Sequence, residues 1–213
     1  WLTDFFKNGG KGVSITLPVK EAALNFADEI SDRARLASAC NVVYAKDKKL
    51  FGDNTDGHGL ITDLENNLKV TLKDKKILIL GAGGAARGII PSIIEKKPAK
   101  LKVANRTESK VLLLKKDLEG KVDLKEKNTI FEAGDLSDDF LLDDSYDIVI
   151  NSTSVSTQAG DSIGLPKALF SGIKLAYDLF YSAEKTAFMQ EALAGGAEKV
   201  SDGWGMLVEQ GAE

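Results

Sequence analysis

Three small residues at fixed spacing, Gly81, Gly83 and Ala86, directly follow the apolar run Ile77–Leu80. The run has the composition of a strand that is buried on both faces. In a Gly-x-Gly-x-x-Ala pattern, the first glycine permits a tight turn and the second leaves the backbone open to a pyrophosphate. Free N–H groups at the start of the following helix bind phosphate oxygens. The spacing predicts a dinucleotide-binding turn, and an ordinary turn between a strand and a helix is the alternative.

The next predicted strand, 101–105, ends in polar and basic residues. Sites for NAD usually place Asp or Glu at this tip, about 20 residues after the glycines, where it binds the ribose 2′-hydroxyl. Here Asn105, Arg106 and Thr107 stand at the tip, and Lys110 follows one turn later. A guanidinium and an ammonium suit a 2′-phosphate, which Arg can bind through two parallel hydrogen bonds. The tip therefore favours NADP over NAD.

A lysine and an aspartate on two separate loops could move a proton. Lys20 follows the turn that Pro18 forces, and Asp56 lies near the end of the polar loop 52–57. Across a cleft, the carboxylate would order the ammonium beside a substrate hydroxyl. The residue types alone leave this open, because most lysines are solvated and Asp56 could simply cap a helix. His58, the only histidine, stands at a predicted helix start and is interpreted as a solvated residue.

Strands and helices alternate along the chain from residue 76 onward. The predicted elements are strands at 76–80, 101–105, 129–132, 147–151 and 175–178 and helices at 84–95, 108–118 and 186–194. Such alternation predicts an α/β fold with a Rossmann-type doubly wound parallel sheet, which would form the nucleotide-binding domain.

The chain before this unit does not fit the alternation and predicts part of a separate α/β domain. Its expected elements are strands at 13–16, 41–45 and 50–52 and helical stretches at 1–8, 21–27, 28–38 and 57–68. The expected division is this first domain at 1–68, a nucleotide domain at 69–203 and the start of a further helix at 204–213. A site between two such domains is the expectation.

The composition is that of a globular protein and excludes several classes. Of 213 residues, 43% are hydrophobic and 28% are charged. The net charge of −4 argues against a nucleic-acid-binding surface, and no apolar run reaches the about 18 residues of a membrane helix. The single cysteine, Cys40, cannot form an intrachain disulfide, which favours a cytoplasmic location. With so few Cys and His residues, no metal site is expected.

Eight short motifs follow one another along nearly the whole chain. They are Ile15–Lys20, Cys40–Val42, Gly52–Gly57, Gly81–Ala85, Asn105–Thr107, Asn151–Ser154, Tyr177–Tyr181 and Asp202–Gln210. In order and spacing they resemble the shikimate dehydrogenase family, whose members reduce 3-dehydroshikimate to shikimate with NADPH. The resemblance implies an NADP-dependent enzyme of aromatic amino acid biosynthesis that acts on a small-molecule substrate.

The resemblance also implies a role for each matching residue. Lys20 and Asp56 would handle the proton at the substrate hydroxyl. The implied substrate-binding residues are Thr16, Lys20, Asn41, Asp56, Tyr181 and Gln210. The implied cofactor-binding residues are Gly81, Ala82, Gly83, Gly84, Ala85, Asn105, Arg106, Thr107, Lys110, Thr153, Gly203 and Met206. Polar side chains of the first set suit a polyhydroxylated carboxylate, which needs directional hydrogen bonds.

Three residues depart from the family's pattern. Ser14 stands where the family usually has Asn, Ser156 where a glycine is common, and Trp204 where Phe or a smaller apolar residue is usual. The family's N-terminal Ser-x-Ser segment and its C-terminal helices have no match. The resemblance therefore implies that 1–68 is an incomplete substrate domain, that the helix beginning at 204–213 returns to it, and that part of the substrate pocket is missing. Two alternatives stay open, an enzyme that also oxidises quinate and a catalytically weak NADP-binding regulatory paralogue. A monomer or a homodimer is expected.

Overall fold

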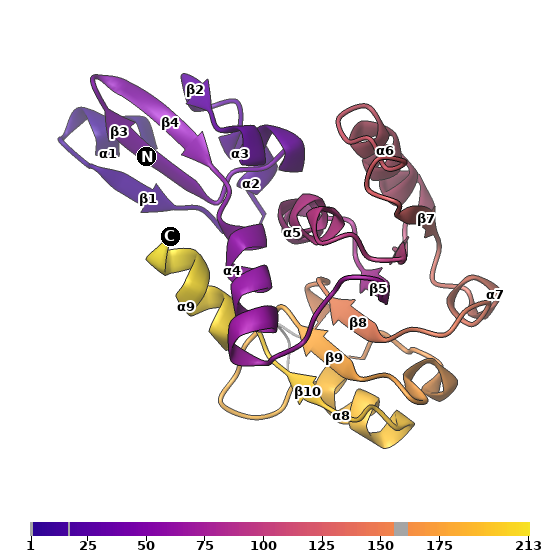
Figure 1. The fold of residues 1–213 in the computed structure, drawn as a ribbon. Helices are drawn as coiled ribbons and strands as arrows, with labels where there is room; N and C mark the ends of the chain where they lie inside the picture. Colours follow the sequence, from indigo (N-terminus) through magenta and orange to yellow (C-terminus); the bar gives the residue numbers. More distant parts are fainter. Residues whose placement is uncertain (1, 17, 156–161) are drawn as a thin grey trace.

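Two sheets organise the chain in the computed structural model, which describes residues 2–16, 18–155 and 162–213 (Figure 1). The first sheet has the strand order β1-β3-β4-β2. Its strands are β1 (Gly12–Ser14), β2 (Glu29–Ile30), β3 (Val42–Lys46) and β4 (Lys49–Asp53). β3 and β4 form an antiparallel pair, β1 joins β3 in antiparallel orientation, and β2 pairs with β4 in parallel.

Short helices accompany the first sheet and correct the predicted helical stretches. They are α1 (Leu2–Lys7), α2 (Lys20–Ala23) and α3 (Asp32–Ala37). The helix predicted at 21–27 is shorter and begins earlier. The helical prediction at 28–38 is wrong in its first part, because β2 pairs with β4 there. α3 begins only after Ser31, whose hydroxyl accepts a hydrogen bond from the backbone N–H of Ala34 and so caps the first turn.

The second sheet is parallel throughout and has the order β10-β9-β8-β5-β6-β7. Its strands are β5 (Lys76–Leu80), β6 (Lys100–Ala104), β7 (Ile130–Gly134), β8 (Ile148–Asn151), β9 (Leu175–Asp178) and β10 (Val200–Ser201). The chain winds outward from β5 in both directions, which is the doubly wound arrangement. The predicted fold class is confirmed, although no prediction covered β10.

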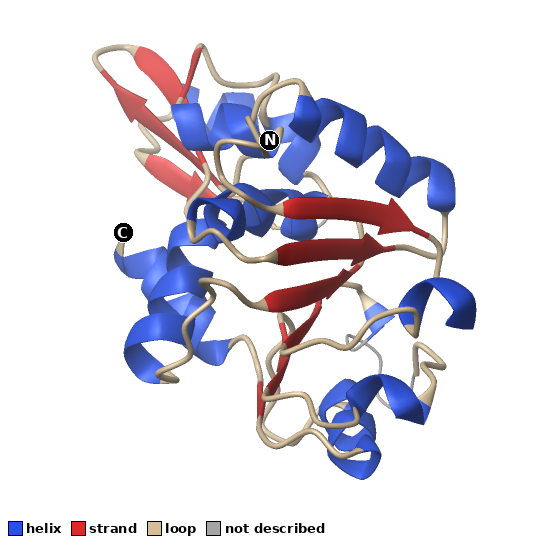
Figure 2. Cartoon of the chain, turned by 45° about the vertical axis from the view of Figure 1, so that its right-hand side comes forward, coloured by secondary structure: helices blue, strands red, loops and turns tan. Residues whose placement is uncertain are grey.

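Helices cover both faces of the second sheet (Figure 2). They are α5 (Gly84–Glu95), α6 (Glu108–Glu119), α7 (Asp138–Leu141), α8 (Ala187–Gly195) and the 3-10 turn η3 (Lys167–Phe170). Ile77 and Ile79 of β5 pack with α5 and α6 in one buried cluster, whereas Leu78 and Leu80 pack with α7 and α8 in another. β5 is thus buried on both faces, as its apolar run predicts.

Two helices lie side by side between the sheets, as Figure 1 shows. They are α4 (Asp56–Thr62), which continues as the π-helix η1 (Asp63–Asn67), and α9 (Trp204–Ala212). A Cβ atom at Gly59 would stand 2.7 Å from both Met206 O and Gln210 Cβ, so glycine permits this close crossing. The crossing brings the first residue of α4 and the last turns of α9 to one place.

A buried hydrogen bond fastens η1 to the second sheet. Tyr177 Oη of β9 donates to Asp63 Oδ2 at 2.7 Å, and the two residues are only 0% and 3% exposed. Burial and this bond raise the pKa of Tyr177, so that the hydroxyl remains a donor. The second oxygen of Asp63 accepts a hydrogen bond from Asn67 Nδ2 at 2.9 Å. Both oxygens of this buried carboxyl therefore have donors.

Removing one of these donors should destabilise the protein. We expect Tyr177→Phe to lower the free energy of unfolding by about 1–3 kcal/mol, because Asp63 would lose a partner that water cannot replace. Urea denaturation followed by circular dichroism measures the change. Tyr44→Phe is the matched control, since Tyr44 lies on β3 and is 37% exposed. Equal stability of the two variants would contradict the argument.

Candidate active site

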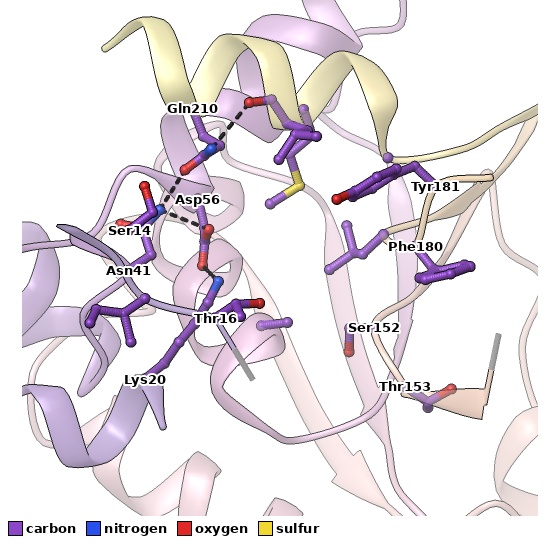
Figure 3. Close-up of a pocket in the computed structure, with 16 residues that line it drawn as sticks. Ser14, Thr16, Lys20, Asn41, Asp56, Ser152, Thr153, Phe180, Tyr181 and Gln210 are labelled. Carbon is purple, nitrogen blue, oxygen red and sulfur yellow. Dashed lines mark hydrogen bonds and ion pairs between the residues drawn. The ribbon is translucent and has the colours of Figure 1, made fainter. Parts of the chain in front are cut away.

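A cavity of about 370 Å³ opens between the two sheets, beyond the carboxyl ends of β5, β8 and β9 (Figure 3). Ligands of doubly wound sheets bind at this edge. The cavity brings together the whole predicted substrate-binding set and four members of the cofactor-binding set. These lining residues are Thr16, Lys20, Asn41, Asp56, Tyr181 and Gln210, with Ala85, Thr153, Gly203 and Met206.

The ion pair of Lys20 and Asp56 lies in the wall of this cavity. Lys20 Nζ stands 2.5 Å from Asp56 Oδ2, and the two side chains are 12% and 4% exposed. Lys20 is the first residue of α2 and Asp56 the first residue of α4. The backbone of Lys20 is held as well, because its carbonyl accepts a hydrogen bond from Cys40 N at 2.9 Å. The residue types alone left this pairing open, and the structure makes it.

Hydrogen bonds of two amide side chains beside the ion pair connect three segments of the chain. Asn41 Nδ2 lies 3.0 Å from Asp56 Oδ1 and 2.8 Å from Gln210 Oε1. Asn41 Oδ1 accepts a hydrogen bond from Thr55 N at 2.9 Å. Figure 3 shows Asn41 between Asp56 and Gln210, so that residues from β4–α4, from α9 and from the loop before β3 form one polar end of the cavity.

Two supporting residues have no counterpart among the predictions. Asn54 and Thr55 are buried at 3% and 5% exposure. Asn54 Oδ1 accepts a hydrogen bond from Asp56 N at 3.1 Å, and Asn54 Nδ2 donates to Ala39 O at 2.8 Å. Thr55, rather than Asp56, occupies the position before α4, so the helix-cap interpretation of Asp56 is wrong. The polar run 52–57 contained a signal for these two supporting roles, because its consecutive polar side chains need different hydrogen-bond partners.

The opposite wall of the cavity comes from the loops after β8 and β9. In Figure 3, Tyr181, Phe180, Ser152 and Thr153 face Lys20 and Asp56 across the space. The lining residues for which the sequence predicted no role are Ser14, Ile15, Ser152, Leu179, Phe180 and Leu207. Most of them lie inside or next to the quoted motifs, so neighbouring positions in those motifs were the available signal.

The glycine turn after β5 has the shape that a diphosphate needs. Gly81 has a φ of +106°, and a Cβ there would stand 2.6 Å from Ser152 Oγ. A Cβ at Gly83 would meet nothing within 4 Å, so its backbone faces open space. Gly83 precedes α5 and no side chain caps that helix, which leaves its first N–H groups for a ligand. A Cβ at Gly84 would come within 3.1 Å of Lys20 Cβ, which places this turn against the ion pair.

The predicted basic tip lies at the same edge of the sheet but outside the cavity lining. β6 pairs with β5 in parallel, with Ala104 opposite Leu80, so the tip and the glycine turn are neighbours. Asn105 Nδ2 donates to Thr107 O at 2.8 Å, which shapes the turn into α6. Arg106 and Lys110 are exposed. An anion at the tip can therefore reach two cations, and the residues present fit an NADP molecule.

His58 and Cys40 take no part in the cavity lining. The His58 side chain is 45% exposed, with Nε2 at 3.3 Å from Glu213 Oε2, as expected of a solvated histidine. Burial raises the pKa of the Cys40 thiol to about 11, so it stays protonated and acts as a small core residue.

Over the described ranges, no group of three or more His, Cys, Asp or Glu could hold a metal ion. Nor, within those ranges, is any helix long and apolar enough to cross a membrane.

Comparison with known proteins identifies the family. Residues 2–43 match the family model described as shikimate dehydrogenase substrate binding domain, and residues 63–159 match that of shikimate / quinate 5-dehydrogenase. Shikimate dehydrogenase (NADP(+)) of Herminiimonas arsenicoxydans is 44% identical over 210 residues, which cover 99% of this chain and 72% of that protein. This chain belongs to the shikimate dehydrogenase family. The corresponding protein of Hahella chejuensis is 44% identical over 208 residues, with 98% and 73% covered.

Solved structures agree with this membership. An Ael1 enzyme from Pseudomonas putida superimposes with a TM-score of 0.85 at 37% identity, covering 99% of this chain and 74% of that one. Shikimate 5-dehydrogenase from Thermus thermophilus, in complex with NADP(H) and shikimate, gives a TM-score of 0.80 at 32% identity, with 99% and 73% covered. The predicted family and enzyme class, an NADP-dependent oxidoreductase that acts on a CH–OH group, are confirmed.

Proposed function

We propose that this chain catalyses the reversible, NADPH-dependent reduction of 3-dehydroshikimate to shikimate in aromatic amino acid biosynthesis. The observation that carries the proposal is the Lys20–Asp56 ion pair at the polar end of the cavity, where the amides of Asn41 and Gln210 join it. A polyhydroxylated substrate needs many directional hydrogen bonds, and these side chains offer both donors and acceptors. The relative from Thermus thermophilus, solved with shikimate and NADP(H), supports the assignment.

Lys20 and Asp56 carry the acid–base chemistry in this proposal. In the direction of reduction, the Lys20 ammonium donates a proton to the carbonyl oxygen as it becomes a hydroxyl. Asp56 accepts the hydrogen bond of Lys20 and holds the ammonium in place, and Asn41 in turn fixes the other carboxylate oxygen. In the direction of oxidation, the neutral amine of Lys20 takes the proton back.

The remaining cavity residues position the substrate. We propose that Thr16, Asn41 and Gln210 hydrogen-bond its hydroxyl and carboxylate groups and that the Tyr181 ring flanks it. The chain would then divide into a substrate domain at 1–68, a nucleotide domain at 69–203 and a helix at 204–213 that returns to the first. Since Gln210 lies on that returning helix, the substrate site would contain residues of the first and of the last of these three segments.

NADPH, when bound, supplies the hydride. Its diphosphate would lie at the glycine turn and the start of α5, and its 2′-phosphate at the tip after β6. The residues that would hold the cofactor are Gly81, Ala82, Gly83, Gly84, Ala85, Asn105, Arg106, Thr107 and Lys110, with Thr153, Gly203 and Met206 on the nicotinamide side. The open space at Gly83 and the two exposed cations at the tip support this assignment.

A methyl group added to α5 should disturb the ion pair from outside the cavity. A Cβ at Gly88 would stand 2.7 Å from Asp56 Oδ2 and 3.1 Å from Asn54 Oδ1. We expect Gly88→Ala to lower kcat by about 10-fold, because Asp56 must move and the geometry of proton transfer is exacting. Steady-state kinetics with shikimate measures the loss, and NADP binding should change little.

The matched control for this change is Gly120→Ala. Gly120 follows α6, and its nearest contacts to an added Cβ are at ordinary distances of 3.5 and 3.6 Å. Because alanine also has the better helix propensity, Gly88→Ala should not lower kcat through helix loss. Full activity of Gly88→Ala would mean that Asp56 tolerates displacement, contrary to the proposed role.

The purified chain should oxidise shikimate with NADP⁺, followed by the absorbance of NADPH. NAD⁺ and quinate serve as parallel substrates. Comparable efficiency with quinate would favour the alternative of a quinate/shikimate dehydrogenase. Tight NADP binding without turnover would favour a catalytically weak regulatory paralogue. Size-exclusion chromatography of the same sample measures the oligomeric state, for which a monomer or homodimer stays the prediction.

A further inference from the structure

Three aromatic rings from two segments contact one another beside the cavity. Phe180 and Tyr181 stack with ring centroids 5.9 Å apart and an interplanar angle of 20°. Tyr181 also meets Trp204 edge to face, with centroids 5.6 Å apart and an angle of 66°. Phe180 and Tyr181 line the cavity, whereas Trp204 does not and is 59% exposed. The Tyr181 ring is therefore held between one neighbour in the cavity wall and one behind it.

The backbones of the two segments are also fastened together. Gly203 N donates to Phe180 O at 3.0 Å, which joins the turn before α9 to the loop after β9. The Asp202 carboxylate accepts from both sides, from Trp204 N at 3.3 Å and from Ser182 N at 3.4 Å. Because these bonds surround the ring contact, Trp204 stands at a fixed place relative to the backbone that carries Tyr181.

Tyr181 needs such support to keep one orientation. The residue is 41% exposed, and an exposed aromatic side chain can exchange between staggered rotamers. Edge-to-face contact with a neighbouring ring favours one of them. Figure 3 shows the Tyr181 ring opposite Asp56 and Lys20, so its orientation determines how a molecule between these walls is held.

We propose that Trp204 is a positioning residue, which holds the Tyr181 ring in the orientation that binds the substrate and so sets the affinity for substrate without touching it. The inference rests on the proposed function, since it takes shikimate as the bound molecule. Trp204, the first residue of α9, would thus help to set the KM for shikimate although it does not line the cavity.

The test compares Trp204→Leu with Trp204→Phe in the full chain. We expect Trp204→Leu to raise the KM for shikimate by about 3- to 10-fold, with kcat and the KM for NADP within about twofold of the parent. Trp204→Phe keeps an edge-to-face ring and should restore most of the affinity. Val208→Ala is the matched control, because Val208 lies one turn later on α9 and is 54% exposed. A KM unchanged by Trp204→Leu would overturn the proposal.

A double-mutant cycle separates positioning through Tyr181 from a general effect on the fold. Tyr181→Ala should raise the KM by itself, and adding Trp204→Leu to it should cause no further change. Additive effects would overturn the proposal, because Trp204 would then act by another route. Calorimetric titration with shikimate gives the same comparison from binding alone. If the parent chain binds shikimate but does not turn it over, the proposed function is wrong and the binding comparison still tests the role of Trp204. If it neither binds nor turns over shikimate, the proposed function and the role of Trp204 are both overturned.

Discussion

Replacing Lys20 by alanine should lower kcat for shikimate oxidation by about 100-fold or more while the affinity for NADP changes little. Lys20 Nζ is the cation beside Asp56 in the cavity wall, and within the described residues no other lysine or arginine lines that cavity. The substrate oxygen would lose its proton donor, and water would have to serve instead. Stopped-flow and steady-state kinetics separate the chemical step from cofactor binding.

Two further variants make this result interpretable. Lys20→Met keeps an unbranched stem against Gly84, where an added Cβ would come within 3.1 Å of Lys20 Cβ, and removes only the ammonium. It should be as slow as the alanine variant. Lys46→Ala is the control for loss of a lysine elsewhere in the first 68 residues, because Lys46 is exposed at the end of β3. Near-normal turnover in Lys20→Met would disprove the proposed acid–base role.

Replacing Arg106 by alanine should reduce the preference for NADPH over NADH by about 10- to 100-fold in kcat/KM. The guanidinium is exposed at the tip after β6, where it can bind a 2′-phosphate through two hydrogen bonds. Water screens an exposed pair of this kind, so the two bonds together should contribute about 1.5–3 kcal/mol, which corresponds to the expected 10- to 100-fold change. The loss should fall on NADPH alone, because NADH carries a hydroxyl at that position.

NADH therefore serves as the internal control of the experiment. Lys116→Ala is the matched protein control, since Lys116 is an exposed cation at the other end of α6. Arg106→Ala and Lys110→Ala together should weaken NADPH further. An equal loss with both cofactors would show that the tip supports the fold of the turn and does not read the phosphate.

The nucleotide-binding sheet was predictable because its signals are local. The apolar run of β5, the glycine spacing and the helix α5 are consecutive in sequence, and β5, α5 and β9 have the predicted bounds. The first sheet was harder, since β2 has two residues and owes its strand conformation to β4, about 20 residues further on. The residue pattern of a short stretch of sequence does not show which distant strand that stretch will pair with.

The candidate site was predictable in its residues but not in its contacts. Residue types and spacing alone left Lys20 and Asp56 as one possibility among many, and the family resemblance supplied the pairing that the structure makes at 2.5 Å. The residues that support the ion pair through hydrogen bonds were not predicted. The side chains of Asn54 and Thr55 donate to the backbone carbonyls of Ala39 and Gln210, and such roles depend on where the chain folds back rather than on the motif itself.

The bond between Asn41 and Gln210 joins residues that are 169 positions apart. Closing a loop of that length costs chain entropy before any contact within it stabilises the structure. The βα units of the second sheet, by contrast, are built from neighbours in sequence and can form early. We therefore expect the polar end of the cavity to assemble late in folding, when α9 docks on α4.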